Sequence, residues 1–572
     1  MKKFIYASAI IALISLVFLR CTDDIDKLKD SIGITITSPE IKSYVHFEFI
    51  DATTGKYITD QKVTVKLSGK DADQLYSKLG ARSTSHNSVR GMVDFILNPK
   101  LDPNTLENNP LEILVTAESS NYAQYLKRIN IHTTDENIIV RVPLVDKTNL
   151  PEGISKSESS KFAVIKDGKV QNTVVAELNS GTSTVEISEG TVLKDESGKT
   201  ISGTIKSEIL FYDPSSEAAL MSFPGGLNVK AVTPTGNTED ISFLSAGLFD
   251  INLTSGTTKV KSFEGGSVKL TTKLDPSLTN PNTEQPIKEG DEIEMWSMDS
   301  ESMIWKFEKI AKVKNINGEL YLQENIDHLS YYNWDWYTPN PSCYSGARIE
   351  FVGTAPQSTI TVKNFHPTNG YNDKFLVAYN PTHSRNGLYF WRVPNFPATF
   401  RFSSDNPHLK FDKSMVVIPN LCEAKTYTIN VSDNRPFYNV NLDLTIVPKS
   451  GGNKKAKANS FFYVKPVDQY YWDYAIMTDG ILETSVAANV EYDIAGYLNN
   501  SYGEGKLKVE DLGNQLRVTL TPDFVFDYVT DENIIGNDKK EERLIDKPKQ
   551  GNTIDLEATL TLPDGIYNKL GL

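Results

Sequence analysis

The sequence is poor in cysteine and has no surplus of basic residues. Three cysteines occur in 572 residues, so at most one disulfide can form within the chain. Lysine and arginine together number 59 against 73 aspartates and glutamates, which gives a net charge of −14. Because phosphate contacts need clustered basic residues, the composition predicts that nucleic acid is not a partner.

Sequence signatures of catalysis are also missing. The seven histidines show no zinc-ligand spacing, and no Gly-x-Ser-x-Gly elbow, phosphate loop, dinucleotide fingerprint or Asp-x-Asp-x-Asp-Gly calcium loop occurs. The many carboxylates leave room for a glycosidase-type pair, but such enzymes typically need a large concave scaffold. The chain is therefore predicted not to be an enzyme and to need no cofactor or metal.

Long apolar runs are absent except at the N-terminus. Lys2 and Lys3 precede a largely apolar run, Phe4–Leu19, which is shorter than the roughly 20 residues that a membrane-spanning helix needs. This is the charged start and apolar core of an export signal. With the cysteine that closes it, the segment resembles a bacterial lipoprotein signal. The resemblance implies a signal peptide at residues 1–20 and a lipid on Cys21.

The residues around Cys21 refine this prediction. Arg20 departs from the lipoprotein pattern, which has a small residue directly before the cysteine. Asp23, Asp24 and Asp26 resemble the acidic signal by which some Gram-negative lipoproteins reach the outer face of the outer membrane. The alternative is a solvated tether at residues 21–34 that no receptor recognises. The resemblance implies a lipid-anchored outer-membrane protein that faces the cell exterior.

Strand patterns run through nearly the whole chain. Apolar and polar residues alternate with the period of two typical of half-buried strands, as in Val440–Ile446 and Ile554–Leu562. Turn-forming pairs such as Asp479-Gly480 separate them, and one short helical turn is expected near residues 71–79. We therefore predict an all-β chain of tandem β-sandwich domains, Ig-like or transthyretin-like.

Stretches rich in proline, glycine and serine divide the chain into domains. Pro151-Glu152-Gly153 opens the first such stretch, 338–341 forms the second and 450–453 the third. These breaks predict four β-sandwiches, at residues 35–150, 151–340, 341–450 and 451–572.

The first domain carries a short, ordered set of motif residues. These are Phe47-Glu48-Phe49-Ile50-Asp51, Thr54-Gly55, Val63-Thr64-Val65, Gly91 with Phe95, and Ala117 with Tyr122. Their order resembles the carboxypeptidase-regulatory-like (transthyretin-like) sandwich, where such residues form a strand, a glycine turn and a closing tyrosine. Despite the family's name, the resemblance implies a spacer or binding module and no peptidase activity.

The second domain carries a longer set of matches over residues 160–336. They are Val185–Thr191, Asp195, Gly198, Ser202-Gly203, Tyr212, Phe223–Leu227, Trp296, Asp299, Trp305 and His328–Asp335. Their order resembles the β-sandwich region shared by cartilage intermediate layer protein and the ankyrin, netrin-receptor and zonula-occludens proteins. The third and fourth domains match no family.

One tripeptide in this second domain could carry chemistry. His328-Leu329-Ser330 resembles the tripeptide at which adhesion receptors, and some relatives of this domain, cleave themselves. Ser330 would attack the Leu329 carbonyl while His328 assists proton transfer, which requires a distorted backbone at that bond. The alternative is that His328 only packs and hydrogen-bonds at a strand end. We favour the alternative.

Cys343 and Cys422 remain once Cys21 is assigned to lipid. In an oxidising compartment they could form a disulfide that closes a loop of about 80 residues, worth about 4 kcal/mol in the chain-entropy model. Two buried free thiols are the alternative, and the sequence does not decide between them.

Dense aromatic runs are the main functional lead. Neighbouring residues of a strand point to opposite faces, so a run such as Tyr470-Tyr471-Trp472-Asp473-Tyr474 cannot lie wholly in one core. The rings either contact a glycan or protein ligand or seal interfaces between domains. Tyr470, Tyr471, Trp472 and Tyr474 are the candidate ligand contacts, because their neighbours are polar.

These observations predict a non-catalytic, lipid-anchored surface protein. Its partners are the membrane, through the lipid, and an extracellular glycan or protein ligand that the tandem sandwiches bind or adhere to. A structural accessory subunit of an outer-membrane complex is the first alternative. A module that cleaves itself at the Leu329–Ser330 bond is the second.

Overall fold

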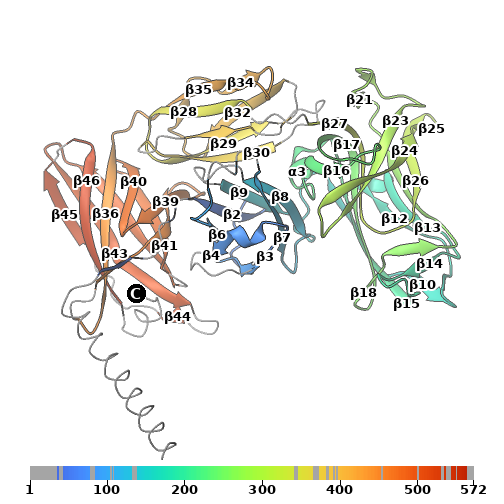
Figure 1. Ribbon diagram of the computed structural model, residues 1–572, viewed down its shortest axis with the longest axis horizontal. Helices are drawn as coiled ribbons and strands as arrows, with labels where there is room; N and C mark the ends of the chain where they lie inside the picture. The colour runs from blue at the N-terminus through green and yellow to red at the C-terminus, as the bar shows by residue number, and fades with distance from the viewer. Residues whose placement is uncertain are drawn as a thin grey trace, which may run out of the picture.

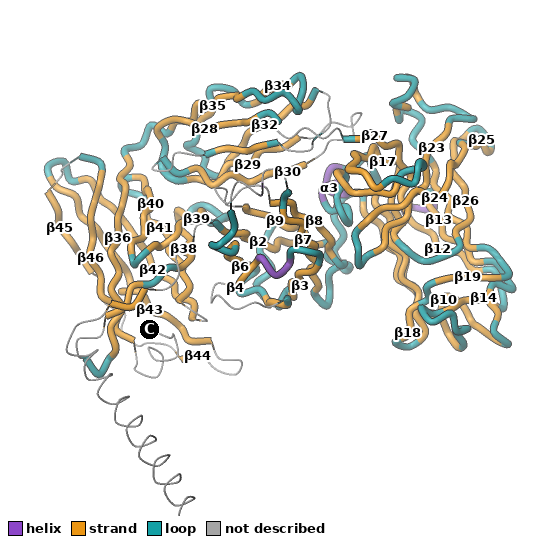
Figure 2. The backbone as a smooth tube through the Cα atoms, in the orientation of Figure 1, coloured by secondary structure: helices purple, strands orange, loops and turns teal. Residues whose placement is uncertain are grey.

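The computed structural model confirms the all-β fold class. It describes residues 35–37, 41, 43–77, 84–102, 106, 109–131, 138–340, 346–364, 373–381, 386–390, 393, 397–451, 455–498, 501–529, 534–535, 543–548 and 551–562. Strands dominate these residues, whereas α3 (Glu217–Met221) is a five-residue helix (Figure 2). The helical turn expected near residues 71–79 is a 3₁₀ helix over Ala72–Gln74.

The first domain is a sandwich of two four-stranded sheets, with strand orders β4-β6-β2-β9 and β5-β3-β7-β8. The apolar residues of the alternating strands, Phe47 and Phe49 among them, fill its core. The strands are β2 (Tyr44–Asp51), β3 (Thr64–Ser68), β4 (Leu75–Ser77), β5 (Ser85–Asn87), β6 (Met92–Leu97), β7 (Leu111–Glu118), β8 (Tyr125–Ile131) and β9 (Ile138–Leu144).

The second domain packs a nine-stranded sheet against a five-stranded sheet. The larger sheet holds β10 (Ile154–Lys166), β11 (Lys169–Val170), β15 (Gly203–Tyr212), β16 (Asn228–Val232), β17 (Thr238–Ser255), β18 (Thr258–Lys259), β23 (Glu292–Asp299), β24 (Ile304–Lys312) and β27 (Tyr331–Pro339). The smaller sheet holds β12 (Val174–Leu178), β13 (Ser183–Ile187), β20 (Val268–Lys273), β25 (Lys314–Ile316) and β26 (Glu319–Ile326). Two short ladders join β14 (Val192–Lys194) to β19 (Ser262–Glu264) and β21 (Thr279–Asn280) to β22 (Gln285–Pro286).

The third domain is a smaller sandwich with strand orders β31-β28-β35-β33 and β30-β29-β32-β34. The strands are β28 (Arg348–Thr354), β29 (Ser358–Asn364), β30 (Asp373–Tyr379), β31 (Gly387–Tyr389), β32 (Ala398–Ser404), β33 (Lys410–Phe411), β34 (Met415–Ile418) and β35 (Thr426–Ser432). One apolar core lies between its two sheets.

The fourth domain is a single hydrogen-bonded sheet of twelve strands around one core, rather than two separate sheets. The strands are β1 (Thr35–Thr37), β36 (Phe437–Pro448), β37 (Lys455–Lys457), β38 (Ser460–Pro466), β39 (Asp473–Thr478), β40 (Ile481–Ala487), β41 (Glu491–Leu498), β42 (Ser501–Asp511), β43 (Gln515–Val529), β44 (Ile534–Ile535), β45 (Arg543–Pro548) and β46 (Thr553–Leu562).

Two of these strands correct the predicted domain limits. β36 pairs with β40 and β46, so the fourth domain already includes residue 437 and does not begin at residue 451. The predicted boundary at residues 450–453 therefore falls between β36 and β37, two strands of the same sheet. β1 pairs in parallel with β37, so residues 35–37 belong to the fourth sheet although the sequence places them beside the first domain.

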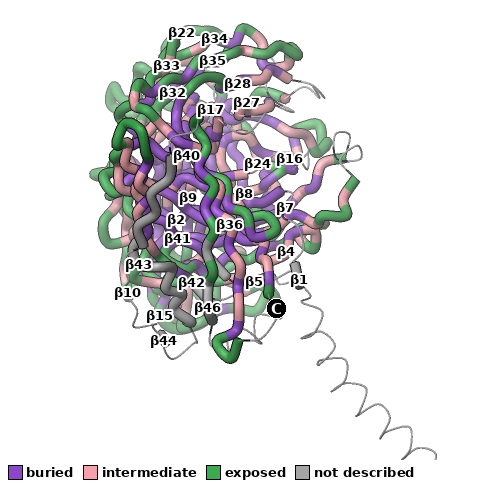
Figure 3. Tube along the Cα trace, turned by 90° about the vertical axis from the view of Figure 1, so that its left-hand side faces the viewer, coloured by how far each residue is buried: buried purple, intermediate pink, exposed green. Residues whose placement is uncertain are grey.

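The four domains do not form a string. The first domain lies in the middle, with the second, third and fourth around it (Figure 1). One apolar cluster joins the first domain to the second, and another joins it to the third and fourth. All eight residues of β2 are consequently buried, because its outer face is covered by other domains, and buried residues fill the interior around β2, β9 and β41 in Figure 3.

Candidate binding site

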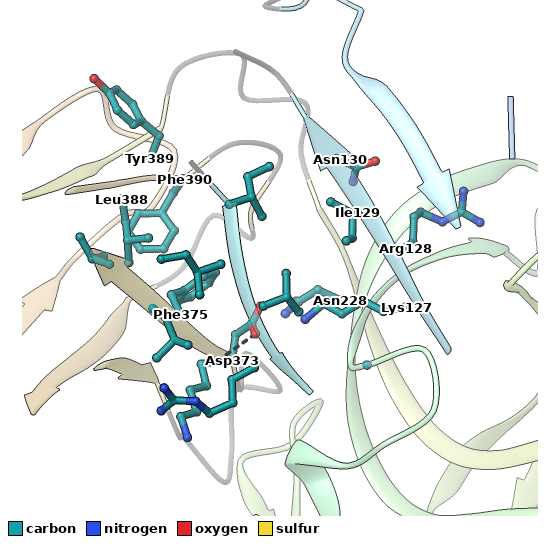
Figure 4. Close-up of a pocket in the computed structure, with 18 of the residues that line it drawn as sticks. Lys127, Arg128, Ile129, Asn130, Asn228, Asp373, Phe375, Leu388, Tyr389 and Phe390 are labelled. Atoms are coloured by element: carbon teal, nitrogen blue, oxygen red, sulfur yellow. Dashed lines mark hydrogen bonds between the residues drawn. The ribbon is translucent and has the colours of Figure 1, made fainter. Parts of the chain in front are cut away.

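A cavity of about 440 Å³ lies where the first, second and third domains meet, and Tyr474 and Ile476 of the fourth domain also line it (Figure 4). Strands β8 and β9 supply the wall from the first domain, and β30 and β31 supply the wall from the third. The second domain contributes the segment Gly225–Lys230, which leads into β16. The volume falls in the range of about 300–1,000 Å³ typical of ligand sites, which favour domain junctions.

The four wall strands share one property, which is that each ends its sheet. Within their sheets β8 pairs only with β7, β9 only with β2, β30 only with β29 and β31 only with β28. Each of the two sandwiches therefore has an open side that faces the cavity. On that side, no hydrogen-bonded ladder joins the edge strands of its two sheets. Core side chains reach the cavity through these openings, including Ile129 and Ile138 from the first domain and Phe375, Leu388 and Phe390 from the third.

The basic side chains of the cavity divide into a paired and an unpaired group, and Arg141, which pairs with Glu48, belongs to the first. Arg128 and Lys230 both pair with Glu112, and Arg128 also donates a hydrogen bond to the Ser302 carbonyl oxygen at 2.8 Å. These contacts hold the first and second domains together. Lys127 and Lys374, by contrast, form no ion pair with any described residue.

Lys127 carries its charge inside the cavity. It is half-buried on β8, facing Asp373 of the third domain. The pKa of Lys127 is raised by Tyr125 and by the Asp373 carboxylate, which together outweigh the opposing effect of burial. The amine therefore stays protonated at neutral pH. The arrangement can hold an anionic group in a cavity whose lining mixes polar and apolar side chains.

The aromatic run of residues 470–474 lies at the junction of the first, third and fourth domains, and of its members only Tyr474 lines the cavity. The Tyr470 ring stacks on Tyr57 with 5.7 Å between ring centroids, and its hydroxyl accepts a hydrogen bond from the Tyr57 backbone N–H. The Tyr471 hydroxyl donates to the Gly55 carbonyl oxygen at 3.0 Å, while the Arg141 guanidinium lies over the Tyr471 ring. These rings seal a domain interface.

A buried polar network lies beneath these rings. Arg141 donates to one Glu48 carboxylate oxygen, and the hydroxyls of Tyr57 and Tyr474 donate to the other. Burial works to raise the pKa of Glu48, but the Arg141 and His46 charges and these hydrogen bonds lower it overall. Glu48 therefore stays ionised although its side chain is fully buried.

This placement revises the candidate ligand residues. Tyr474 lines the cavity, but it is only 6% exposed and its hydroxyl donates to Glu48, so little of it is open to a ligand. Trp472 packs against the same interdomain cluster, and Tyr471 is partly buried. Tyr470 keeps 44% of its surface exposed and is the remaining candidate of the four.

The structure does not bring His328 and Ser330 together as a base and a nucleophile. The Ser330 hydroxyl donates to the Met298 carbonyl oxygen. His328 Nδ1 lies 2.7 Å from an Asp327 carboxylate oxygen and 3.2 Å from the Tyr332 hydroxyl. Neither residue has a left-handed backbone, and no cis peptide occurs in the described chain. This geometry matches the packing alternative.

The remaining predicted positions are only partly described. Cys21 and Cys343 lie outside the described residues, so lipidation and the disulfide stay predictions. Cys422 packs beside the core of the third domain. Among the described residues no cluster of three or more histidine, cysteine or acidic side chains could hold a metal, and no helix is long and apolar enough to cross a membrane.

Sequence reasoning missed the cavity. Its only local signal is the β8 sequence Tyr125–Ile131, in which Lys127 stands at a position whose neighbours Tyr125 and Ile129 face the core. A lysine on the inward face is a feature of edge strands. Nothing in the sequence shows that three domains meet at that edge.

Comparisons with known proteins do not identify the chain. No family model matches the sequence, and no curated protein matches it. Among solved structures, the major pilin subunit BcpA of Bacillus cereus is 8% identical and aligns over 90% of this chain and 98% of its own, with a TM-score of 0.13. The RrgB pilus protein of Streptococcus pneumoniae is 7% identical over 80% of this chain and 91% of its own, also at 0.13. Scores this low carry no argument, so the family resemblances of the first two domains stay predictions.

Proposed function

We propose that this chain is a non-catalytic cell-surface protein that binds a ligand in the cavity between its first three domains. The observation that supports this proposal is the combination in one cavity of open sandwich edges, core side chains in the lining and a lysine that forms no ion pair with any described residue. Ligand sites typically combine apolar side chains with a few placed polar groups, and this cavity presents both. The cavity replaces the aromatic run of residues 470–474 as the candidate binding site, because the rings of that run lie mainly in a domain interface.

The arrangement of the domains favours binding over a purely structural stalk. A stalk gains reach by placing its domains end to end, whereas here three domains surround the first. Clustered domains extend less far than domains placed end to end, but their junction creates the cavity. The alternative is a purely structural scaffold role, and a binding screen distinguishes the two roles.

The test is a binding screen of the purified full-length chain in mild detergent against immobilised glycans and extracellular proteins. The affinity of any ligand found is then measured for the variant Lys127→Gln combined with Lys374→Gln, which removes the two lysine charges that pair with no described residue, at nearly constant side-chain volume. The matched control is Lys161→Gln combined with Lys166→Gln, because both lysines are exposed on β10 of the second domain. We expect at least tenfold weaker binding for the cavity variant and unchanged binding for the control.

Two results would contradict the proposal. A ligand whose affinity falls on Tyr470→Ala but not in the cavity variant would place the site at the aromatic run. The absence of any ligand in the screen would favour the scaffold role.

Lipid anchoring belongs to the same proposal. Replacing Cys21 with serine removes the only thiol that the lipoprotein pattern could acylate, because both other cysteines lie far along the chain. We expect Cys21→Ser to move the protein from the membrane fraction to the soluble fraction on cell fractionation, while Cys422→Ser leaves it in the membrane. Unchanged association of Cys21→Ser would leave residues 4–19 as an uncleaved anchor.

A further inference from the structure

We infer that the ligand of the cavity is an extended acidic peptide of a partner protein, which adds as a strand to the free edge of β8. This inference rests on the proposed function and names the chemistry of its ligand. It is argued from the backbone of β8, from the side chains beside it and from the charge of Lys127.

The backbone of β8 offers hydrogen-bonding groups that no described residue uses. The Leu126 carbonyl oxygen accepts a hydrogen bond from Gly225 N–H at 2.9 Å, across the side of β8 that faces away from β7. Successive residues of a strand turn their N–H and C=O groups to opposite sides, so Arg128 and Asn130 face the same way as Leu126. Their backbone groups have no partner among the described residues.

A free strand edge beside a cavity is the arrangement in which an extended peptide gains main-chain hydrogen bonds. Gly225 already uses the first outward position, which shows that the edge is oriented to accept such bonds. A globular sugar or a small molecule would leave the outward groups of Arg128 and Asn130 without strand-like partners. The geometry therefore favours a peptide.

The side chains around β8 fit the alternating faces of a strand. A strand beside β8 would turn every second side chain toward the opening of the first sandwich, where Ile129 and Ile138 lie. The intervening side chains would face Leu227 and Asn228 of the second domain. Apolar residues are thus expected at alternate positions of the peptide.

Lys127 sets the charge of the peptide. An inward lysine on an edge strand opposes pairing with an uncharged strand, because the amine would lose water without gaining a partner. A carboxylate on the peptide removes that cost by pairing with the amine. Lys374 on β30, across the cavity and without an ion pair to any described residue, adds a second positive charge. Asp240 and Asp373 also line the cavity, but its five lysine and arginine side chains outnumber them, so an acidic peptide fits better than a basic peptide.

The probe is a fluorescein-labelled ten-residue peptide of alternating valine and threonine with two central aspartates. A second peptide carries lysines in place of the aspartates, and a third carries N-methyl groups on alternate amides. Fluorescence anisotropy with the full-length chain measures each affinity. We expect the acidic peptide to bind at least tenfold more tightly than either of the others.

Two variants at one position separate strand addition from side-chain contact. Asn130→Pro removes an outward N–H from β8 and leaves the ladder to β7 intact, because residue 130 faces away from β7. Asn130→Ala removes the exposed side chain and keeps the N–H. We expect about tenfold weaker binding of the acidic peptide for Asn130→Pro and little change for Asn130→Ala. Circular dichroism checks that both variants fold.

The outcomes distinguish this inference from the proposed function. Equal binding of the acidic and N-methylated peptides, or full affinity in Asn130→Pro, would overturn strand addition. If the screen nevertheless finds a ligand that depends on Lys127 and Lys374, the cavity remains a binding site for another class of ligand. Equal binding of acidic and basic peptides would overturn the role of Lys127. No binding of any peptide would identify Lys127 as protection of the β8 edge against pairing.

Discussion

Glu48 and Arg141 form an ion pair that is almost completely removed from water, with side chains 0% and 5% exposed. Desolvation makes such a pair a weak source of stability, but losing one partner leaves a buried charge uncompensated. Tyr57 and Tyr474 satisfy the remaining lone pairs of the carboxylate, so the network is well paired on the Glu48 side. Breaking the network would therefore destabilise both the first domain and its interface with the fourth domain.

Replacing Arg141 with leucine should therefore destabilise the protein strongly. We expect a loss of about 3–5 kcal/mol in the free energy of unfolding, because Glu48 would keep a buried, unpaired charge. Urea unfolding followed by tryptophan fluorescence measures the loss. The control is Lys66→Ala, which breaks an exposed pair with Glu118 in the same domain and should cost less than about 1 kcal/mol. Equal losses for both variants would contradict the assigned role of burial.

Asp250 on β17 should make the second domain less stable as the pH rises. Burial, with a smaller contribution from Glu208, raises the pKa of Asp250 to about 7. The folded state thus binds a proton more tightly than the unfolded state, whose aspartate pKa is about 3.9. The resulting stabilisation is complete below the unfolded pKa and is lost as the pH rises through 7.

The variant Asp250→Asn should flatten this dependence. Burial also raises the pKa of Asp335 and Glu294 in this domain, so we expect wild-type stability to fall by roughly 3–4 kcal/mol more than that of Asp250→Asn between pH 4 and pH 8. Urea midpoints at four pH values measure it. The exposed Glu196→Gln in the same domain serves as control and should keep the wild-type slope. A variant whose slope matches that of the wild type would rule out Asp250 as the titrating group.

The burial of these polar residues could not be predicted from the local pattern. His46 and Glu48 occupy the polar positions of an alternating strand, where the sequence indicates contact with solvent. The residues that cover them come from the fourth domain; Tyr474 and Glu48 are 426 positions apart in the chain. Sequence periodicity carries no information about so distant a contact.

At the scale of elements, the turn-forming residues of the sequence predict one hairpin turn that the structure confirms. Asp479-Gly480 was expected to punctuate two strands, and it joins β39 to β40 with positive φ at both residues, 50° and 75°. These values fit a type I′ hairpin turn, which matches the twist of the flanking strands. A Cβ atom on Gly480 would lie 2.6 Å from the Leu444 carbonyl oxygen, so the position also lacks space.

Gly480→Ala should therefore cost more than backbone strain alone. We expect a loss of about 2–4 kcal/mol, from a left-handed alanine and from the clash with β36. Gly513→Ala in the β42–β43 turn is the matched control, because Gly513 has φ of 88° but open space around its Cβ position. It should lose only about 1 kcal/mol. Thermal unfolding measures the loss of stability of both variants. Equal losses would contradict a contribution from the clash with β36.

Strand patterns predicted elements but not their partners. The alternation over Val440–Ile446 is confirmed, because β36 alternates strictly between buried and half-buried residues. Its assignment to the third domain was wrong, since β36 pairs with β40 and β46. A period of two fixes which face of a strand is buried, and it does not say which strand lies beside it. The free edges that line the cavity escaped prediction for the same reason.

At the scale of the whole molecule, the junction around Tyr471 and Trp472 holds the fourth domain against the first. Tyr471 stacks under Arg141, and Trp472 packs in the cluster that joins the first, third and fourth domains. Interdomain contacts of this kind decide whether neighbouring domains move as one body.

Replacing both rings, Tyr471→Ala with Trp472→Ala, should loosen this junction. We expect a larger radius of gyration by small-angle X-ray scattering and a separate unfolding transition for the fourth domain, because the lost rings leave a cavity in the interface. Most of the cavity lining comes from the other three domains, with Tyr474 and Ile476 from the fourth, so binding in the cavity should largely remain. Leu512→Ala, at a site 49% exposed on the fourth domain, is the control. An unchanged radius would show that the remaining contacts suffice.

The pairing of β1 with β37 determines how the molecule would respond to pulling. If residue 21 is tethered to a membrane, tension enters the folded body through Thr35–Thr37, and hence through the fourth domain rather than the first. Parallel strands pulled along their length resist in shear, with all their hydrogen bonds loaded together. The fourth domain would then be the first part of the folded body to carry the tension, ahead of the three domains that form most of the cavity.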